Sequence, residues 1–293
     1  IRYSIFIYKT PSYYSILTHH LNRIIYFPKE NTEAKSSKSK MKKIVEVSDT
    51  EEAVAISMAK YTAHLSHKFA KERGYFTVVL SGGYLINSLR KLVEPPYINS
   101  VDWAKWHVFW LDERVVPLDH PDSNYKLAYD GFLSKVPIPS ENIYPIDGTL
   151  AAKGAAEEAA DDYEKRLKDL VNKKVIDLSS SGFPRFDLQL LGMGPDGHVA
   201  SLFPGHPLLQ EKQRWVTFIR NSPKLPPVRI TFTFPVINSS AYVTMTVVGP
   251  GEVDAVATAL GENQTYPLLP VQMVAPEVEL KWFLDKEATS KLP

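Results

Sequence analysis

Two different spacings of apolar residues alternate along this chain, and each predicts one kind of element. Apolar residues at positions 54, 58, 61, 65 and 69 recur at helical intervals and predict a helix that ends at Gly74. The run Phe76–Leu80 that follows is continuously apolar, as in a strand buried on both faces. Helical segments and apolar runs of this kind recur toward the C-terminus.

The same patterns predict the remaining elements. Further strands are predicted at 107–111, 186–191, 215–219, 229–234, 242–248 and 282–284, and further helices at 85–93, 122–133, 156–170 and 253–260. Ser48 and Glu51 have the spacing of a capping box at the start of the first helix, and 199–203 is expected to begin another helix. Strands that alternate with helices predict an α/β fold, with a doubly wound, mostly parallel sheet flanked by helices.

Two of the predicted strands end in groups suited to binding an anion. Ser81-Gly82-Gly83 joins a strand to a helix, and such a turn directs free backbone N–H groups and a helix N-terminus at an anion. A tight turn without a ligand explains the two glycines equally well. Asp112-Glu113-Arg114 follows the next strand, where Arg114 is able to bind a phosphate or carboxylate, or to pair with Asp112 or Glu113.

The stretch 186–204 places a histidine at a third strand end. Its apolar run breaks at Gly192-Met193-Gly194-Pro195, and Asp196-Gly197-His198 follows. Ligands of open α/β sheets bind beyond the carboxyl ends of the strands, so this position favours a catalytic role for His198, with Asp196 close enough to orient its imidazole. A solvated or capping histidine and a turn-forming aspartate are the alternatives.

Composition narrows the class of protein. The chain has 293 residues, of which 44% are hydrophobic and 23% charged, as in ordinary globular proteins. With 34 basic and 33 acidic residues the net charge is +1, which argues against a nucleic-acid partner. The absence of cysteine excludes disulfides, thiolate metal sites and cysteine nucleophiles. No run approaches about 18 apolar residues, so no membrane partner is expected.

The N-terminal segment differs from the rest of the chain. Residues 1–40 contain only two acidic residues, and the run 35–43 is rich in lysine and serine. Such a segment cannot build a core, so we expect residues 1–42 to be a leader outside the fold and residues 43–293 to form a single α/β domain. A transit peptide and upstream sequence translated in error before Met41 both remain open.

Four motifs in a fixed order resemble a known family. LSGG at 80–83 precedes a helix, WLDER at 110–114 ends a strand, and LLGMGPDGHVASLFPG occupies 190–205. A lysine-containing loop then leads into RITFTFPVIN at 229–238. Together these motifs resemble the 6-phosphogluconolactonases, and the plant enzymes in particular, over residues 41–292. The block at 190–205 is the most specific of the four.

This resemblance implies the hydrolysis of 6-phospho-D-glucono-1,5-lactone to 6-phosphogluconate, with a small sugar-phosphate lactone as the partner and without a metal or organic cofactor. It implies that His198 is a general base that removes a proton from water and returns it to the leaving ring oxygen. An unperturbed imidazole, with a pKa near ~6.5, suits that role. Asp196 is expected to orient the ring or the substrate hydroxyls.

The resemblance also implies a site for the substrate and its phosphate. The residues expected there are Ser81, Gly82, Gly83, Asp112, Arg114, Lys224 and Arg229. Among them, Lys224 and Arg229 are expected to hold the phosphate, and Arg114 to meet the substrate's negative or developing charge. Tyr84 stands where family members often have a small polar residue, which puts a hydroxyl contact at that position in question.

Two other functions and three compartments remain open. Amino-sugar phosphate deaminase/isomerases share this fold and bind sugar phosphates, whereas a non-catalytic binder would keep the cationic residues without needing His198. The cytoplasm is the expected location, with plastid and peroxisome as alternatives. Ser290-Lys291-Leu292 is a peroxisomal address only at a free carboxyl terminus, and here Pro293 follows it.

Overall fold

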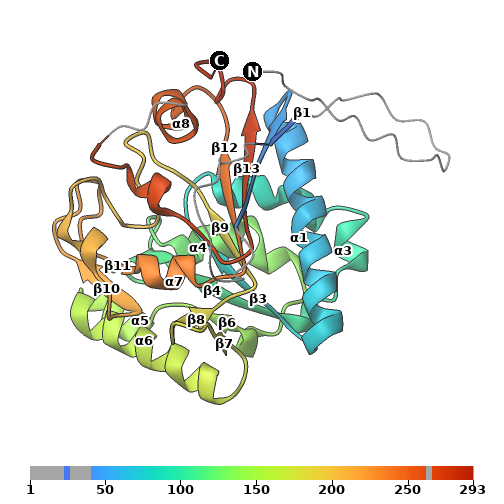
Figure 1. Cartoon of the computed structure of the whole chain (residues 1–293). Helices are drawn as coiled ribbons and strands as arrows, with labels where there is room; N and C mark the ends of the chain where they lie inside the picture. Colours follow the sequence, from blue (N-terminus) through green and yellow to red (C-terminus); the bar gives the residue numbers. More distant parts are fainter. Residues whose placement is uncertain (1–22, 27–40, 262–265, 293) are drawn as a thin grey trace.

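Strands and helices that alternate along the sequence assemble into one large sheet with helices on both faces (Figure 1). The protein is seen here as a computed structural model that describes residues 23–26, 41–261 and 266–292. The α/β fold predicted from the sequence is confirmed. Most of the expected leader, and Pro293, lie outside the described residues.

Eight strands of the described residues form the main sheet in the spatial order β1-β2-β13-β12-β9-β3-β4-β6. All neighbours from β2 to β6 run parallel, as expected of strands that are joined by helical crossovers. From β2 onward, in that spatial order, the strands span Lys42–Ser48, Glu279–Asp285, Tyr242–Val247, Leu188–Leu191, Phe76–Leu80, Trp106–Trp110 and Ile143–Tyr144. The carboxyl ends of β9 and β3 therefore lie near the middle of one edge of the sheet.

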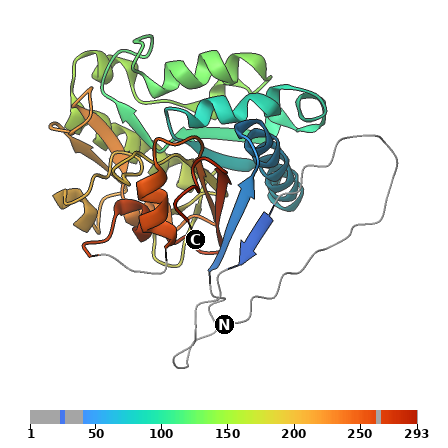
Figure 2. The same cartoon turned by 90° about the horizontal axis from the view of Figure 1, so that it is seen from above.

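Strand β1, Arg23–Tyr26, pairs antiparallel with β2 at the side of the sheet (Figure 2). These four residues belong to the segment that we expected to lie outside the fold. Without β1, strand β2 would expose a row of unpaired N–H and C=O groups, which readily accept a further strand. The RIIY sequence of β1 is rich enough in β-branched residues to provide it.

Helices connect these strands. They are α1 Glu51–Arg73, α2 Leu85–Ser88, α3 Tyr97–Ser100, α4 Asn124–Gly131, α5 Gly148–Ala152, α6 Ala156–Asn172, α7 Phe234–Asn238 and α8 Val253–Leu260. Short 3-10 helices span Leu89–Val93, Trp103–Lys105, Leu133–Lys135, Ser140–Asn142, Pro207–Gln210 and Pro270–Met273. The two longest helices, α1 and α6, lie on opposite faces of the main sheet (Figure 1).

Successive side chains of the central strands enter two separate hydrophobic cores. Val78 and Leu80 of β3 pack in the core that α1 covers, whereas Val79 packs in the core that α6 covers. One continuous apolar run fills both cores, because neighbouring side chains of a strand point to opposite faces. Both faces of the sheet are thus occupied by packing, and the strand ends are the places where polar groups can meet a ligand.

A second, antiparallel sheet adjoins the carboxyl end of β4 in the order β10-β11-β5. Its strands span Val216–Ile219, Arg229–Phe232 and Asp112–Arg114, and a two-stranded ribbon is formed by β7 Asp177–Leu178 and β8 Pro184–Arg185. The strands predicted at 215–219 and 229–234 thus exist, but they lie outside the parallel sheet. The register places Arg229 directly opposite Arg114.

Some local predictions were wrong. No helix begins at 199–203, where Val199 and Leu202 form an isolated bridge and Ala200 has a φ of +53°. The left-handed conformation of Ala200 explains this, because a right-handed helix cannot continue through it, and the bent turn still buries both bridging side chains in the core. Helix α1 is capped by Thr50, whose hydroxyl accepts the Ala53 N–H, rather than by Ser48. The predicted helix at 85–93 is divided between α2 and a 3-10 turn.

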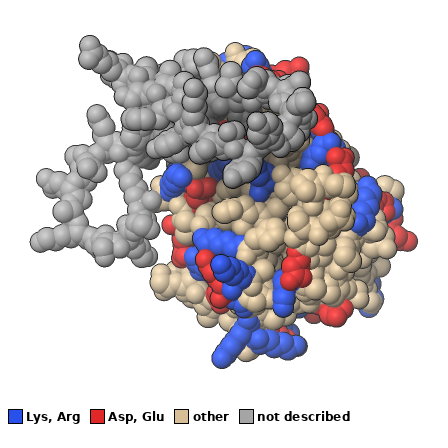
Figure 3. Space-filling view, turned by 90° about the vertical axis from the view of Figure 1, so that its right-hand side faces the viewer, with Lys and Arg blue, Asp and Glu red and all other residues tan. Residues whose placement is uncertain are grey.

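Charged side chains of both signs are interspersed on the face shown in Figure 3. Some of the charged side chains of the protein form ion pairs. Arg90 pairs with Glu51 and Glu52, and Lys91 pairs with Glu52 and Glu94. Within the described ranges, every helix is too short or too polar to cross a membrane.

Candidate active site

A cavity of about 370 Å³ opens where the carboxyl ends of β3, β9 and β12 meet the second sheet. Seven of the nine residues predicted for the site, all of them described, line its wall: Ser81, Gly82, Gly83, Asp112, Arg114, His198 and Arg229. Most of them converge because parallel strands deliver their carboxyl ends to the same edge, whereas Arg229 is brought there by the pairing of β11 with β5. Asp196 and Lys224 lie outside the wall.

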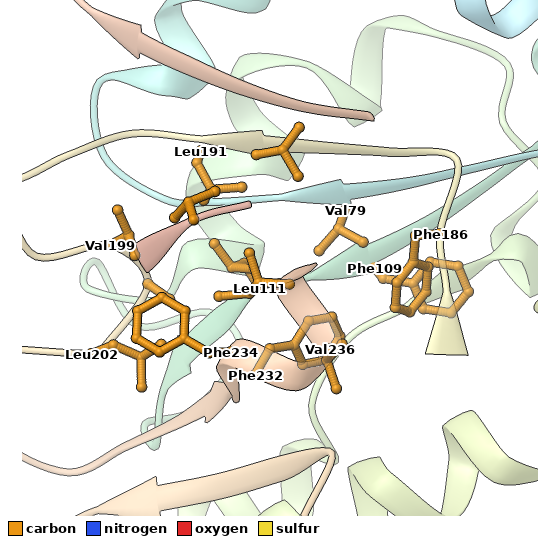
Figure 4. Close-up of a cluster of buried hydrophobic side chains, with 14 of the residues drawn as sticks. Val79, Phe109, Leu111, Phe186, Leu191, Val199, Leu202, Phe232, Phe234 and Val236 are labelled. Carbon is orange, nitrogen blue, oxygen red and sulfur yellow. The ribbon is translucent and has the colours of Figure 1, made fainter. Parts of the chain in front are cut away.

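The turn after β9 fixes the position of His198. Val199 and Leu202, which follow it, are anchored in the hydrophobic core (Figure 4). The Gly194 N–H donates to the His198 carbonyl oxygen at 3.0 Å, so the turn closes on itself. A Cβ at Gly194 would lie 2.1 Å from His198 Cε1, and only glycine therefore allows the ring to approach. Phe203 packs against the same ring at a centroid distance of 4.6 Å.

Asp196 orients this imidazole. Its Oδ1 lies 2.5 Å from His198 Nδ1 and accepts the His198 backbone N–H at 3.3 Å. Partial burial acts to raise the pKa of Asp196, but the hydrogen bond and charge of His198 outweigh it and hold that pKa below its usual range. An ionised Asp196 accepts a hydrogen bond from Nδ1–H. Because a neutral imidazole carries only one ring proton, Nε2 is then unprotonated. Nε2 has no hydrogen-bond partner among the described residues.

The Ser81-Gly82-Gly83 turn packs closely against α4. A Cβ at Gly82 would lie 1.9 Å from Asn124 Oδ1, so this contact requires glycine. Gly83 has a φ of +68°, a conformation that other residues adopt at a cost. In the part of the chain that the structure describes, the backbone N–H groups of Gly82 and Gly83 donate no hydrogen bond. They are free to bind an anion.

Asp112 lies at the centre of a buried polar network behind the cavity. The Ser201 hydroxyl donates to Asp112 Oδ2 at 2.7 Å, and Asn124 Nδ2 donates to the Asp112 main-chain oxygen at 2.9 Å. Arg229 Nη1 in turn donates to Ser201 Oγ at 3.5 Å. The network links the second sheet, the turn after His198 and helix α4, so each supports the position of the others.

Two arginines on neighbouring strands line the cavity wall. Arg114 and Arg229 are direct cross-strand partners, an arrangement in which like charges repel. Burial lowers the pKa of Arg229, and the charge of Arg114 adds to this effect, although Asp112 opposes it. A bound anion would relieve this repulsion, and the pair therefore favours an anionic ligand.

The two arginines differ in the donors that they can offer. Arg229 Nε and Nη2 donate to the carbonyl oxygens of residues 224–226 at 2.8 to 3.0 Å, so much of this side chain anchors the loop before β11. Arg114 Nη1 donates to the Asp122 carbonyl at 2.6 Å, whereas its buried Nε has no partner in the described structure. Arg114 is consequently the better candidate for direct contact with an anion.

Lys224 and Tyr84 lie nearer to solvent than the sequence suggested. Lys224 stands on an exposed loop, and its main-chain oxygen, rather than its ammonium group, is tied into the site through Arg229. Tyr84 lines the mouth of the cavity with 45% of its surface exposed, but its hydroxyl accepts a hydrogen bond from Asn87 Nδ2 at 3.1 Å. The Tyr84 hydroxyl is therefore directed to its own helix.

Glu113 supports the site from beneath. Its carboxylate accepts the backbone N–H groups of Arg114, Asn124 and Tyr125 at 2.7 to 2.8 Å, and the Ser123 hydroxyl at 3.2 Å. Burial raises the pKa of Glu113 to about 7, although these backbone donors act to lower it. The side chain fastens the start of α4 to β5, and in this way it places Asn124 beside the glycine turn.

Three residues of the site were missed by the sequence analysis. Asn124 and Glu252 line the cavity, and Ser201 lies behind it. Ser201 is part of the motif at 190–205, and Asn124 follows a helix-capping serine, so both had a nearby signal. Glu252 had none, because a polar residue before a helix is ordinary. Among the described residues, no three His, Asp or Glu side chains converge as metal ligands.

An oriented imidazole that shares a cavity with two arginines, at the carboxyl ends of a parallel sheet, defines an enzyme for a small anionic substrate. The sequence model of the glucosamine-6-phosphate isomerases/6-phosphogluconolactonase family matches residues 49–282. The chain therefore belongs to this family, and within it to the plant 6-phosphogluconolactonase enzymes.

Individual relatives and a solved structure agree with this assignment. The probable 6-phosphogluconolactonase 4, chloroplastic, of Oryza sativa subsp. indica is 65% identical over 247 residues, covering 83% of this chain and 75% of the rice protein. The 6-phosphogluconolactonase 3, chloroplastic, of Arabidopsis thaliana is 62% identical over 252 residues, covering 86% and 76%. The crystal structure of 6-phosphogluconolactonase from Thermotoga maritima is 28% identical, with a TM-score of 0.69 over 84% of this chain and 100% of that one.

Proposed function

We propose that this enzyme hydrolyses 6-phospho-D-glucono-1,5-lactone to 6-phosphogluconate, in the oxidative pentose phosphate pathway, with His198 as the general base. The observation that carries the proposal is the 2.5 Å contact between Asp196 Oδ1 and His198 Nδ1, in a cavity that Arg114 also lines. This contact leaves Nε2 as the free basic nitrogen beside the cationic wall.

In the proposed reaction, His198 Nε2 removes a proton from a water molecule as that water attacks the lactone carbonyl carbon. The bond between this carbon and the ring oxygen then breaks, and the ring oxygen takes the proton back from the imidazolium. Ionised Asp196 stabilises the imidazolium between the two steps. The new carboxylic acid finally releases a proton to solvent, so that turnover is measurable as acid release.

The phosphate is bound, in this proposal, by the free donors of Arg114, the positive field of Arg229 and the N–H groups of Gly82 and Gly83. Repulsion between the two arginines supports this, because a dianion between them would neutralise it. Lys224, on the neighbouring loop, remains an additional predicted phosphate ligand. A bound phosphate would hold the lactone carbonyl near His198. The binding energy of the phosphate, which does not react, would in this way orient the carbonyl group, which does.

Two variants, one expected to affect the rate and the other expected to affect binding, test the roles proposed for His198 and Arg114. His198→Ala should lower kcat by about 10²–10⁴-fold in a pH-stat assay corrected for spontaneous lactone opening. Its inhibition constant for 6-phosphogluconate should stay within about threefold of wild type, since ligand contacts remain. Arg114→Ala should instead weaken 6-phosphogluconate binding by about tenfold.

Two results would contradict the proposal. Turnover by His198→Ala within a few-fold of wild type would show that the base is another group. Release of ammonia from glucosamine 6-phosphate would favour the deaminase/isomerase alternative.

We also propose the plastid as the compartment, in place of the cytoplasm, because the rice and Arabidopsis relatives are described as chloroplastic. A fluorescent protein fused after residue 293 of the full chain should accumulate in plastids. The same fusion to a chain that starts at Met41 should stay outside them. Identical distributions of the two fusions would contradict the proposal.

A further inference from the structure

Glu252 is an acidic side chain in the cavity wall for which the proposed mechanism has no use. It precedes α8, in the connection after β12, whereas Asp112 and Arg114 come from the connection after β4. In the sheet, β12 and β4 lie on opposite sides of β9 and β3. A negative charge thus enters the cavity from one side, and the arginines enter it from the other.

The Glu252 carboxylate is half-buried but unpaired. It makes no capping hydrogen bond to α8, and it has no hydrogen-bond or ion-pair partner anywhere in the described ranges. Burial, without any opposing charge or donor, raises the pKa of Glu252 above its usual range. In Asp112, the other carboxylate of the wall, Oδ2 accepts the Ser201 hydroxyl at 2.7 Å and Oδ1 accepts Asn124 Nδ2 at 3.5 Å. Glu252 therefore makes none of the contacts by which a buried carboxylate would stabilise the fold, although it lies in a cavity suited to anions.

Hydrolysis changes the charge of the ligand. The lactone carries only the charge of its phosphate, whereas the product carries one more negative charge, on the carboxylate formed by ring opening. A fixed negative charge in a confined site repels both ligands, and it repels the product more strongly. The effect is directional in this cavity, because among the residues that the structure describes no cation lowers the pKa of Glu252.

We propose that Glu252 is a specificity-determining residue that disfavours the open, more anionic product relative to the lactone, and so limits product inhibition. The inference rests on the proposed function, since it assumes that lactone and product share this cavity. It assigns Glu252 no part in the proton transfers.

A charge series at position 252 tests the inference. Glu252→Gln should lower the inhibition constant of 6-phosphogluconate by about fivefold and the KM of the lactone by only about twofold, at pH 8 and low ionic strength. Glu252→Lys should extend the same trend. Asp254→Asn is the matched control, because it removes one charge from the exposed face of the same helix. It should change neither constant by more than about 1.5-fold.

The possible results distinguish a failure of the inference about Glu252 from a failure of the proposed function on which it rests. An unchanged inhibition constant in Glu252→Gln would overturn the inference, because the charge would then have no effect on product binding. A higher inhibition constant would also overturn it, because the carboxylate would then favour the product, for instance by accepting hydrogen bonds from its hydroxyls. Equal effects of Glu252→Gln and Asp254→Asn would also overturn it. Neither result bears on whether wild-type enzyme hydrolyses the lactone, which the acid-release assay measures directly.

Discussion

Strand β9 carries an aspartate beyond each of its ends, and the two aspartates have different surroundings. Asp187, before the strand, is fully buried, and its Oδ2 accepts the Thr77 N–H at 2.8 Å and the Thr77 hydroxyl at 3.0 Å while pairing with Arg73. Asp196, after the strand, has a side chain that is 33% exposed, and its partner His198 lines the cavity. One group is closed off by the fold, and the other remains open to a ligand.

The pKa values of the two aspartates move in opposite directions for this reason. Burial raises the pKa of Asp187 to about 6, although Arg73 and Thr77 act to lower it. Less complete burial lets His198 hold the pKa of Asp196 below its usual range. The comparison teaches that a carboxylate surrounded by protein acts mainly on stability, whereas one that retains access to a cavity is suited to chemistry.

Removing the buried aspartate should have the largest effect. Asp187→Ala leaves Arg73 without its buried partner and should lower the free energy of unfolding by about 3–5 kcal/mol. Asp177 pairs with the same arginine but is 43% exposed, so Asp177→Ala should cost only about 0–1 kcal/mol. Urea denaturation of the two variants measures both values. Similar losses of unfolding free energy in the two variants would show that the burial of Asp187 does not increase its contribution to stability.

Asp187 should also make stability depend on pH. Its folded pKa of about 6 lies above the ~3.9 of an unfolded aspartate, so folding favours the protonated form. The resulting stability is fully present below pH ~4 and is lost as the pH rises to about 6, by up to about 3 kcal/mol. Wild type should therefore lose stability relative to Asp187→Asn over this window. A constant difference between their unfolding free energies would contradict the prediction.

At the open end of the strand, Asp196→Asn should affect rate rather than stability. An amide does not hold the imidazole in the tautomer that leaves Nε2 basic, so kcat should fall by about 100-fold. The free energy of unfolding should stay within about 1 kcal/mol of wild type, because the side chain is partly exposed. Initial rates and denaturant midpoints check the two halves of the prediction. A variant that loses stability but keeps its kcat would show that Asp196 acts on stability rather than on the reaction.

Two glycines of the same turn sharpen the comparison further. A Cβ at Gly194 would meet the His198 ring at 2.1 Å, whereas a Cβ at Gly192 would meet nothing within 4 Å. Gly194→Ala should therefore displace the imidazole and lower kcat by about tenfold, while Gly192→Ala should stay within about twofold. Equal kcat values in the two variants would indicate that the ring position is not critical.

The smallest effect is expected at Lys224. Its side chain is exposed on the loop beside the cavity, so a screened contact with the phosphate is the most that it should provide. Lys224→Ala should raise the KM of the lactone by about threefold and leave kcat unchanged. Raising the salt concentration should reduce the difference. A loss of kcat instead would place Lys224 among the reacting groups.

The sequence by itself determined the element types and the positions of the chemically active groups. Strand β3 and helix α8 have the bounds that local periodicity predicted, 76–80 and 253–260, because side-chain burial repeats with the backbone period of each element. His198, Asp196 and Arg114 were predicted from their places at strand ends, since a parallel sheet gathers those ends at one edge.

Only the tertiary structure decided which of these groups are free to act. Arg114 and Arg229 are 115 positions apart in sequence order, yet their strands pair, and backbone carbonyls then occupy most donors of Arg229 but not those of Arg114. The left-handed turn at Ala200 interrupts the helix expected at 199–203, and Glu252 has no hydrogen-bond or ion-pair partner in the described structure. The physical reason is that hydrogen-bond partners and burial come from residues distant in sequence, which no local pattern records.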